Sequence, residues 1–402
     1  MKEKILWISP YAPYDSVRHA GGKVHNYYVK SFHKSGLFDI TLLSLCLKEE
    51  EKFLDLDKYG IKNHIYVMDQ TKWKQFERRA TSAWSYVNPY DKYAGACLDY
   101  ERKKILELLK AYKKEGENPD IVMLQWTFSV MLTPVIRKYF PDSKIIDIEE
   151  DVTFLGYQRK WEQASGDIQK WFWKKRYQKI HTLELERLKE GSLIVTNNPK
   201  DTKLLIDSGI QQEKIFTSVP YFDKYTRCVR SNCRKDILFV GAMNRPENYK
   251  SALWFIDEVM PVLEKEGFRF LVIGGNPPAE LLRKASEKIQ IKGYVEDILP
   301  YLEQSLCFAA PLLFGAGIKI KVLEAMSAGI PVLTNGVGIE GIPAENGVEY
   351  ILCEKKEDYI NAVKRLSEDK EAAGRISRME KEFIKKEYHL EARTQQFIEK
   401  VK

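Results

Sequence analysis

The stretch PLLFGAGIKIKVLEAMSAGIPVLTNGVGIEG, residues 311–341, predicts a buried strand, a glycine turn, a helix and a second strand. The turn contains Gly315 and Gly317, the helix covers about residues 318–328, and the second strand covers residues 330–334. In open α/β sheets, ligands bind outside the carboxyl ends of the strands, and the N-terminus of the following helix favours anions. A phosphate group is therefore the first ligand that this stretch suggests.

Charged side chains at the start of this helix have the chemistry of a nucleotide site. Lys319 and Lys321 can add positive charge to the free N–H groups of the first turn. Glu324, one turn later, can accept two hydrogen bonds from neighbouring hydroxyls, as acidic residues do with a ribose. The alternative is an ordinary buried strand–helix–strand unit whose lysines and glutamate are solvated.

This stretch resembles the donor-site signature of the retaining nucleotide-sugar glycosyltransferases of family 4, the glycosyl transferases group 1. The family's first Glu, which touches the donor hexose, is replaced here by Ala316, as in subgroups that have a glycine-rich turn and basic residues at this place. The second Glu is kept as Glu324, for which we also predict a catalytic role. The resemblance assigns donor binding to Gly317, Ile318, Lys319, Lys321 and Glu324.

At 402 residues the chain is longer than most domains with a single hydrophobic core, so we expect two domains. Strand and helix patterns alternate along both halves, which predicts doubly wound parallel sheets. A net charge of +7 allows an anionic partner, such as a nucleotide phosphate or an anionic lipid.

Glycines follow the first predicted strand, residues 4–9, in the turn before a helix. Gly21 and Gly22 can let the backbone approach a diphosphate closely. By itself, such a pair is more often a flexible turn. In the resembled family, a loop with a Gly-Gly pair faces the donor phosphates and the acceptor, so both glycines are predicted to bind the donor.

An acidic cluster, Glu149, Glu150 and Asp151, follows the predicted strand at residues 144–148. Carboxylates there can orient or deprotonate a sugar hydroxyl, and we predict a catalytic role for Glu149 and Asp151. The alternative is three solvated acids in a loop or in a first helical turn. The family often has a catalytic-site His after the strand matched by residues 121–126, where this chain has Gln125 and Trp126.

Three turns of the second half are predicted to complete the donor site. Arg245 follows the strand at residues 236–241 and can reach a phosphate, and Asn248 is expected to cap the next helix. The turn at Gly274 permits close approach to a flat base. The segment with Tyr294 and Val295 resembles the family's base-binding segment.

Residues 71–113 and 161–177, the latter containing WFWKKRY, are rich in aromatic and basic side chains. Such helices can lie in a membrane interface, or can be packed helices with snorkelling bases. Stacking on single-stranded nucleic acid is a third option, but no known nucleic-acid module surrounds them. We therefore predict an anionic membrane surface as a candidate partner and no nucleic-acid partner.

The resemblance implies an α/β protein of the GT-B fold: two facing Rossmann-like, doubly wound domains with parallel sheets and a cleft between them. We expect an N-terminal acceptor domain over residues 1–220, with a C-terminal helix at 383–402 crossing back onto it. The donor domain is expected at residues 221–382.

The predicted activity is transfer of a hexosyl unit from a UDP- or GDP-sugar to a glycan or lipid-linked acceptor, with retention of configuration, in bacterial polysaccharide or cell-surface glycan biosynthesis. No metal and no cofactor are expected, because helix N-termini and basic side chains can stabilise the leaving diphosphate. Two alternatives stay open: a nucleotide-sugar-binding protein without transferase activity, and a nucleotide-sugar epimerase on the same fold. We expect a cytoplasmic protein, peripheral on the inner face of the plasma membrane if the aromatic and basic patches bind lipid.

Overall fold

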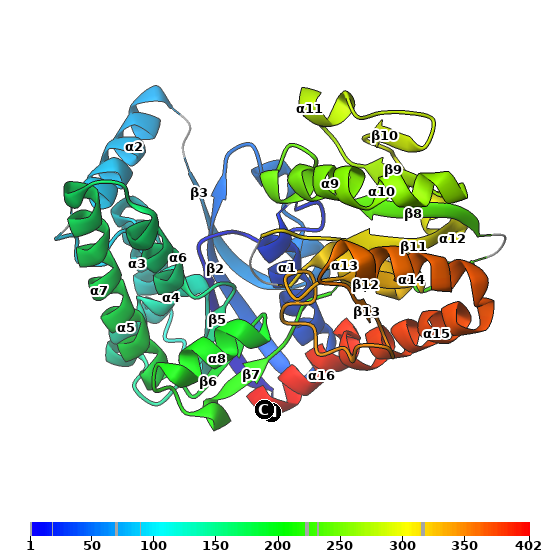
Figure 1. The fold of residues 1–402 in the computed structure, drawn as a ribbon. Coiled ribbons are helices and arrows are strands. Elements are labelled where there is room, and N and C mark those ends of the chain that lie inside the picture. The colour runs from blue at the N-terminus through cyan, green and yellow to red at the C-terminus, as the bar shows by residue number, and fades with distance from the viewer. Residues whose placement is uncertain are drawn as a thin grey trace. The chain divides into compact units, whose positions relative to one another are not determined.

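The computed structural model describes residues 2–17, 19–68, 71–88, 90–221, 225–230, 233–314 and 318–402. The chain divides into two compact units (Figure 1). Unit 1 is Met1–Val219 together with Thr394–Lys402, and unit 2 is Pro220–Arg393. The sequence predicts domains at residues 1–220 with 383–402, and at residues 221–382.

Unit 1 contains a parallel sheet of seven described strands in the order β3-β2-β1-β4-β5-β6-β7. The strand order reverses between β1 and β4, so the carboxyl ends of these two strands flank the switch point of the sheet. The strands are β1 (Glu3–Ser9), β2 (Phe38–Leu47), β3 (Lys62–Met68), β4 (Ile121–Gln125), β5 (Lys144–Glu149), β6 (Leu193–Thr196) and β7 (Ile215–Thr217).

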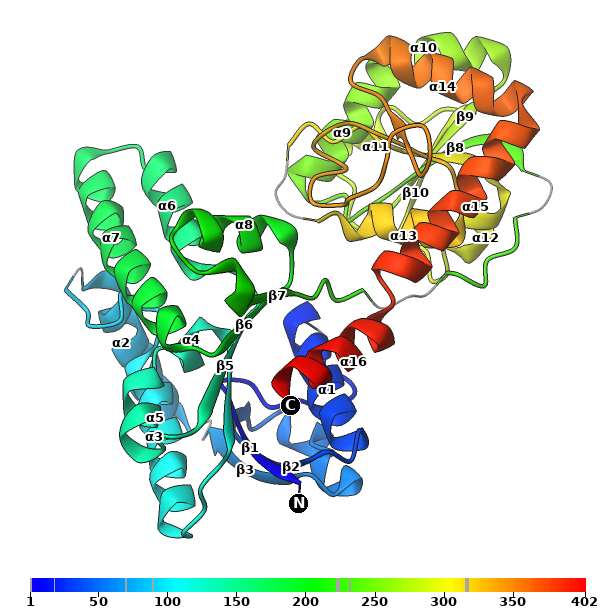
Figure 2. The ribbon, with the colours of Figure 1, turned by 90° about the horizontal axis from the view of Figure 1, so that it is seen from below.

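Two hydrophobic cores cover the two faces of this sheet, because alternate residues of a strand point to opposite sides. On one face, Ile5 and Trp7 of β1 pack with α1 and α16, and on the other, Leu6 and Ile8 pack with α3 to α8 (Figure 2). The helices are α1 (Ala20–Lys34), α2 (Lys72–Val87), α3 (Asp99–Lys114), α4 (Trp126–Val130), α5 (Thr133–Tyr139), α6 (Thr153–Gln163), α7 (Asp167–Glu190), α8 (Pro199–Asp207) and α16 (Leu390–Val401), with short 3₁₀ turns η1 (Glu51–Phe53), η2 (Leu56–Tyr59) and η3 (Gln212–Lys214).

Unit 2 contains a parallel sheet of six described strands in the order β10-β9-β8-β11-β12-β13. Its switch point lies between β8 and β11. The strands are β8 (Arg234–Val240), β9 (Arg269–Ile273), β10 (Ile289–Gly293), β11 (Ser305–Ala310), β12 (Val332–Thr334) and β13 (Ile351–Leu352). The helices are α9 (Pro246–Glu258), α10 (Met260–Leu263), α11 (Ala279–Leu282), α12 (Leu299–Gln304), α13 (Ile320–Ala328), α14 (Lys356–Glu368) and α15 (Lys370–Glu387), with the 3₁₀ turn η4 (Glu264–Glu266).

Both units are therefore doubly wound α/β domains, which confirms the predicted fold class. Each brings the loop after its first strand and the loop after its fourth strand together at the carboxyl edge of the sheet. These two edges carry the predicted site residues.

Candidate functional site

The β8 end of the unit 2 switch point is built on a close approach of two glycines. Gly274, which follows β9, has φ +154°, and a Cβ there would lie 1.6 Å from the Gly241 carbonyl oxygen. The Gly241 N–H donates to the Ile273 carbonyl at 3.0 Å and so extends the ladder past β8. Only glycine fits at position 274, and this contact sets the path of the turn that leads into α9.

Arg245, rather than Asn248, is the N-cap residue of α9, so the predicted cap is wrong. Pro246 fits the first helical position, which starts the helix three residues earlier than expected. The Asn248 amide instead donates to the Ala242 carbonyl at 2.8 Å, and its Oδ1 accepts a hydrogen bond from Lys321 Nζ. Asn248 thus links the β8–α9 turn to the start of α13.

Three cations lie at the N-termini of α9 and α13. The Arg245 side chain is exposed, with Nη1 3.8 Å from Glu247 Oε1. Lys319 is the N-cap residue of α13, and its largely buried Nζ lies 3.5 Å from Glu340 Oε2. The pKa of Lys321 is lowered to about 8, chiefly by burial; the charge of Glu247 opposes this shift, and the charges of Lys319 and Arg245 add to it.

The remaining predicted donor residues surround this edge. Glu324 lies in the second turn of α13. Burial raises the pKa of Tyr225, and the charge of Glu324 adds a smaller contribution. Tyr294, after β10, is 79% exposed and lies next to Gly275, whereas Val295 is half-buried. Ile318 is close to Gly341. Gly317 lies outside the described residues.

Unit 1 has a pocket of about 590 Å³ at the carboxyl ends of β1 to β5. Its apolar wall comes from strand ends and from the segment before α3, and includes Leu45, Leu47, Met68 and Leu98. Its polar wall includes Glu101, on α3, and Asp151, after β5. Partial burial of the Asp151 carboxyl raises its pKa, as does the charge of Asp201.

The structure separates the two acids for which the sequence predicted a catalytic role. Glu149 points into the interior, where its Oε2 accepts a hydrogen bond from Thr127 Oγ1 at 2.6 Å. Burial, and then the charge of Glu184, raise the pKa of Glu149 well above its ordinary value. Asp151 alone of the pair lines the pocket.

Glu150, for which the sequence predicted no role of its own, lies between the strand ends. Gln125 Nε2 donates to its Oε1 at 2.7 Å, and Asn197 Nδ2 donates to its Oε2 at 2.5 Å. Burial raises the pKa of Glu150 to about 8, with a smaller contribution from Asp151. A Cβ at Gly21 would lie 3.5 Å from this carboxylate, so Glu150 sits directly beside the start of α1.

Trp126 occupies the place where the resembled family often has a His. Its φ of +64° is rare for a bulky residue, a strain of the kind that clusters at functional sites. Its ring makes edge contacts with Tyr11 and with the fully buried His25, both with centroids 5.3 Å apart. The pKa of His25 is lowered to about 3, chiefly by burial and to a smaller extent by His19. No sequence signal pointed to His25, which is one turn into an ordinary amphipathic helix.

Gly22 supports the start of α1. Its N–H donates to Nδ1 of His19, the N-cap residue, at 3.0 Å, and a Cβ at Gly22 would lie 2.6 Å from the His19 ring. Gly21 lies against Trp126 and Glu150. Glycine is therefore required at position 22 for close packing within the loop.

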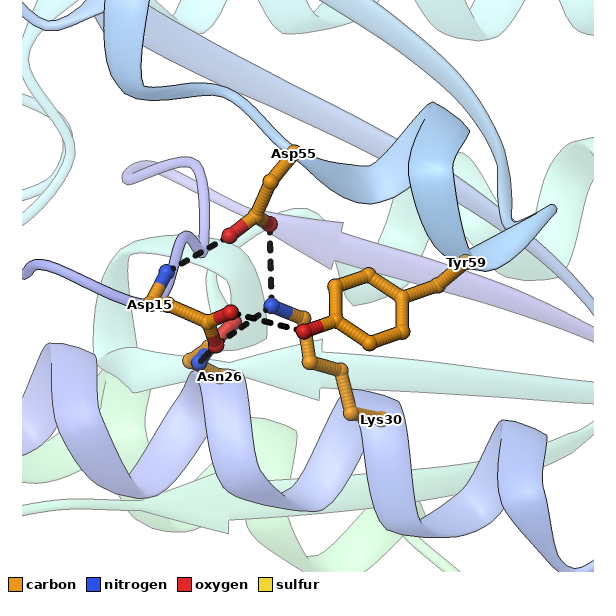
Figure 3. A network of polar contacts seen from close by, with 5 residues as sticks. All are labelled: Asp15, Asn26, Lys30, Asp55 and Tyr59. Carbon is orange, nitrogen blue, oxygen red and sulfur yellow. Dashed lines mark hydrogen bonds and ion pairs between the residues drawn. The ribbon is translucent and has the colours of Figure 1, made fainter.

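A polar network ties this loop to α1 and to η2 (Figure 3). Lys30 donates to Asp15 at 2.6 Å and to Asp55 at 2.9 Å, and its Nζ lies 4.0 Å from the Tyr59 ring centre. The Tyr59 hydroxyl and the Asn26 amide also donate to Asp15. The network fixes the loop that carries Tyr11 and His19 into the pocket.

Among the described residues, no three His, Cys, Asp or Glu side chains are grouped closely enough to hold a metal ion. In the same part of the chain, no helix is both long and apolar enough to cross a membrane.

Residues 234–369 match the family model described as Glycosyl transferases group 1. An uncharacterized 44.6 kDa protein in the cps region of Klebsiella pneumoniae is 27% identical over 165 residues, which are 37% of this chain and 42% of that protein.

Solved structures show the fold. Anabaena Alr3699/HepE in complex with UDP superposes with a TM-score of 0.63 at 12% identity, covering 100% of this chain and 99% of that chain. Sucrose-phosphate synthase from Thermosynechococcus elongatus superposes with a TM-score of 0.61 at 14% identity, covering 98% of this chain and 97% of that chain. The lipopolysaccharide outer core galactosyltransferase WaaB gives 0.59 at 14% identity, covering 98% of each chain. The chain thus has the GT-B fold, and its residues 234–369 are similar to the glycosyl transferases group 1 family.

Proposed function

We propose that the chain transfers a hexosyl unit from a UDP- or GDP-sugar to a hydroxyl of a glycan or lipid-linked acceptor, with retention of configuration and without a metal. The observation that carries the proposal is the meeting of Arg245, Lys319 and Lys321 at the N-termini of α9 and α13. Helix N-termini and cations at a switch point form a diphosphate site.

The roles of the other residues follow from their places around this edge. On this proposal Glu324, one turn into α13, accepts hydrogen bonds from the ribose hydroxyls. On the same proposal the exposed Tyr294, after β10, contacts the base. HepE, a protein of the same fold, binds UDP and UDP-glucose, which supports a nucleoside diphosphate sugar as the donor. The relative from a cps region supports a role in bacterial polysaccharide biosynthesis.

The test begins with thermal stabilisation by UDP, GDP and ADP, each with magnesium and with EDTA. Lys319→Ala and Glu324→Ala should each lower transferase turnover about 30-fold to 1,000-fold, because a lost charge-assisted contact to the leaving group costs about 2–4 kcal/mol of barrier. Lys364→Ala is the matched control, since Lys364 pairs with Glu266 on the surface of the same unit. Proton NMR of the product's anomeric centre reads out retention.

Wild-type turnover by both site variants would refute the donor site, and loss of turnover in EDTA would refute metal independence. Conversion of the donor without any acceptor would favour an epimerase. Nucleotide stabilisation without turnover on any acceptor would favour a binding protein.

We further propose that unit 1 lies on an anionic membrane surface, so that the protein is a peripheral protein of the cytoplasmic face. In α2, the exposed fractions of Trp73, Phe76 and Trp84 are 72%, 63% and 67%, respectively. In α7, the exposed Trp171 lies among exposed Lys170, Lys174 and Lys175. Aromatic and basic side chains together favour a lipid interface.

Part of the predicted patch is instead internal packing. Arg176 is fully buried and donates to the carbonyls of Ser85, Asn88 and Ala94, so it joins α7 to the end of α2. Sedimentation with vesicles rich in phosphatidylglycerol, at low salt, should fall in the Trp73→Ser/Phe76→Ser variant and not in Leu282→Ser, an exposed leucine of unit 2. Equal sedimentation with neutral vesicles, or no sedimentation, would contradict the proposal.

A further inference from the structure

The loop of residues 10–19, which joins β1 to α1, is fastened at three places. Both of its ends line the pocket of unit 1, through Tyr11 and through His19. The start of the loop is tied to β2 by a backbone hydrogen bond, from the Ala12 N–H to a carbonyl of that strand at 2.9 Å. The end of the loop is tied to α1, because His19 is the N-cap residue of this helix. The third attachment, at Asp15, holds the segment between them.

This third attachment converges on one ammonium group, that of Lys30 on α1 (Figure 3). Lys30 Nζ lies 2.6 Å from Asp15 Oδ1 and 2.9 Å from Asp55 Oδ1. The Asp15 N–H also donates to Asp55 Oδ2 at 2.9 Å, so the backbone and the side chain of the loop depend on the same charged groups. The side chains of Lys30 and Asp55 are only 14% and 10% exposed, so salt and water screen this ion pair little.

Lys30 is the one cation among the five residues of this network, Asp15, Asn26, Lys30, Asp55 and Tyr59. Without it, the carboxylates of Asp15 and Asp55 would lie close together and repel each other. The hydrogen bond from Lys30 is the largest of the effects that hold the pKa of Asp15 well below its ordinary range. The other side chains that donate to Asp15, those of Tyr59 and Asn26, are neutral and cannot balance two negative charges.

We propose that Lys30 is a positioning residue of the transferase, and that it holds the loop of residues 10–19, through Asp15, in the arrangement that turnover requires. This inference rests on the proposed function and assigns to it a residue that does not line the pocket. Lys30 acts only through the loop. Because the two ends of the loop keep their own attachments, loss of the ammonium group opens the loop locally and leaves α1 and the sheet folded.

The first test compares Lys30→Met with Lys34→Met, the matched control at an exposed lysine of the same helix. Hydrogen exchange of the full-length protein, measured by mass spectrometry, should be about tenfold faster in the peptide of residues 10–17 of Lys30→Met, the effect of losing hydrogen bonds to a charged group. Peptides from residues 24–33 should exchange as in the wild type, and Lys34→Met should match the wild type throughout. Lys30→Arg should restore the protection, because its forked guanidinium can reach both carboxylates.

Turnover of the same samples separates positioning from structural support. Release of UDP from UDP-glucose and of GDP from GDP-mannose, with and without a glycan acceptor, measures it. In Lys30→Met, kcat/KM should fall about 10-fold to 100-fold, the effect of a small displacement near the reacting groups, and Lys30→Arg should recover it. Thermal stabilisation by UDP or GDP should not change, because Arg245, Lys319 and Lys321 belong to unit 2.

A second variant, Asp15→Asn, removes the loop carboxylate and leaves Lys30 paired with Asp55. If Asp15 and Lys30 act as a unit, the double variant Asp15→Asn/Lys30→Met should be no worse than Lys30→Met in loop exchange or in turnover. Wild-type exchange of the loop in both single variants would overturn the inference. A loop that opens without any loss of turnover would overturn the positioning role, as would additive losses in the double variant.

The two readouts keep this inference distinct from the proposed function. A wild-type protein that no nucleotide stabilises refutes the donor site, and the thermal shift alone shows this. A wild-type protein that binds and turns over a nucleotide sugar, with Lys30→Met equally active, refutes only the role of Lys30.

Discussion

At the scale of single residues, the proposed donor site has its most specific consequence at Lys321. Its ammonium group lies 5.0 Å from the Phe239 ring centre and donates to Asn248, in surroundings that lower its pKa to about 8. Its ordinary pKa is 10.5, so between about pH 8 and 10.5 the folded state binds fewer protons than the unfolded state. The stability cost of this buried charge is thus fully present below pH 8 and disappears as the pH rises through 10.5. A bound diphosphate would reverse the preference, because it favours the charged form.

We therefore predict that binding of UDP or GDP at pH 8.5 takes up a substantial fraction of one proton per site, and that the uptake decreases towards pH 7. Phosphate groups, with a second pKa of about 6, are already deprotonated at pH 8.5 and add little. Calorimetric titration in Tris and in HEPES, whose ionisation heats differ, measures the uptake. Lys321→Met keeps the length of the side chain and should abolish the difference between the buffers. Equal binding heats in both buffers for the wild type would contradict the assignment.

At the scale of elements, the sequence predicted most strands and missed those with weak patterns. Short runs such as residues 4–9 and 144–148 are mostly apolar, and β1 and β5 form there. The strand β3 escaped prediction because most of its residues are only half-buried, so its sequence KNHIYVM mixes polar and apolar residues without strict alternation. The three-residue β7 is too short to show any period. Both are edge strands, where burial on two faces is not required.

One part of the candidate site could be predicted, because its position depends only on the order of strands and helices along the chain. The helices after β8 and β11 start at the same edge of a parallel sheet, so the order of strands and helices suffices to bring Arg245, Lys319 and Lys321 to that edge. The pocket was not predictable, because Tyr11, Glu101 and Trp126 come from three separate segments that only the fold brings together. The distinction between Glu149 and Asp151 depends on which way two neighbouring side chains point at a strand end. Charge clusters in a sequence carry no such information.

At the scale of the whole molecule, the chain ends in the unit where it began. Unit 1 includes Thr394–Lys402, while α15, with Phe383, belongs to unit 2. Phe397 of α16 is fully buried, and its ring contacts Tyr28 and Phe32 of α1 and Phe216 of β7. The last helix therefore completes a core whose other members precede it by about half the chain or more, whatever the orientation of the two units.

This topology predicts that a change at the C-terminus weakens the N-terminal unit and spares the unit that immediately precedes it in sequence. Phe397→Ala should destabilise unit 1 by about 3–5 kcal/mol, the cost of a cavity in a packed core. Hydrogen exchange measured by mass spectrometry should show lost protection in peptides from β1 and α1, with β8 and β11 unchanged and UDP or GDP binding retained. Glu399→Ala, on the exposed side of the same helix, should leave every peptide as in the wild type. The buried face of α16 packs into the core of unit 1. Loss of protection in β8 and β11 as well would contradict the prediction, because it would mean that the two units unfold together and are not independent folding units.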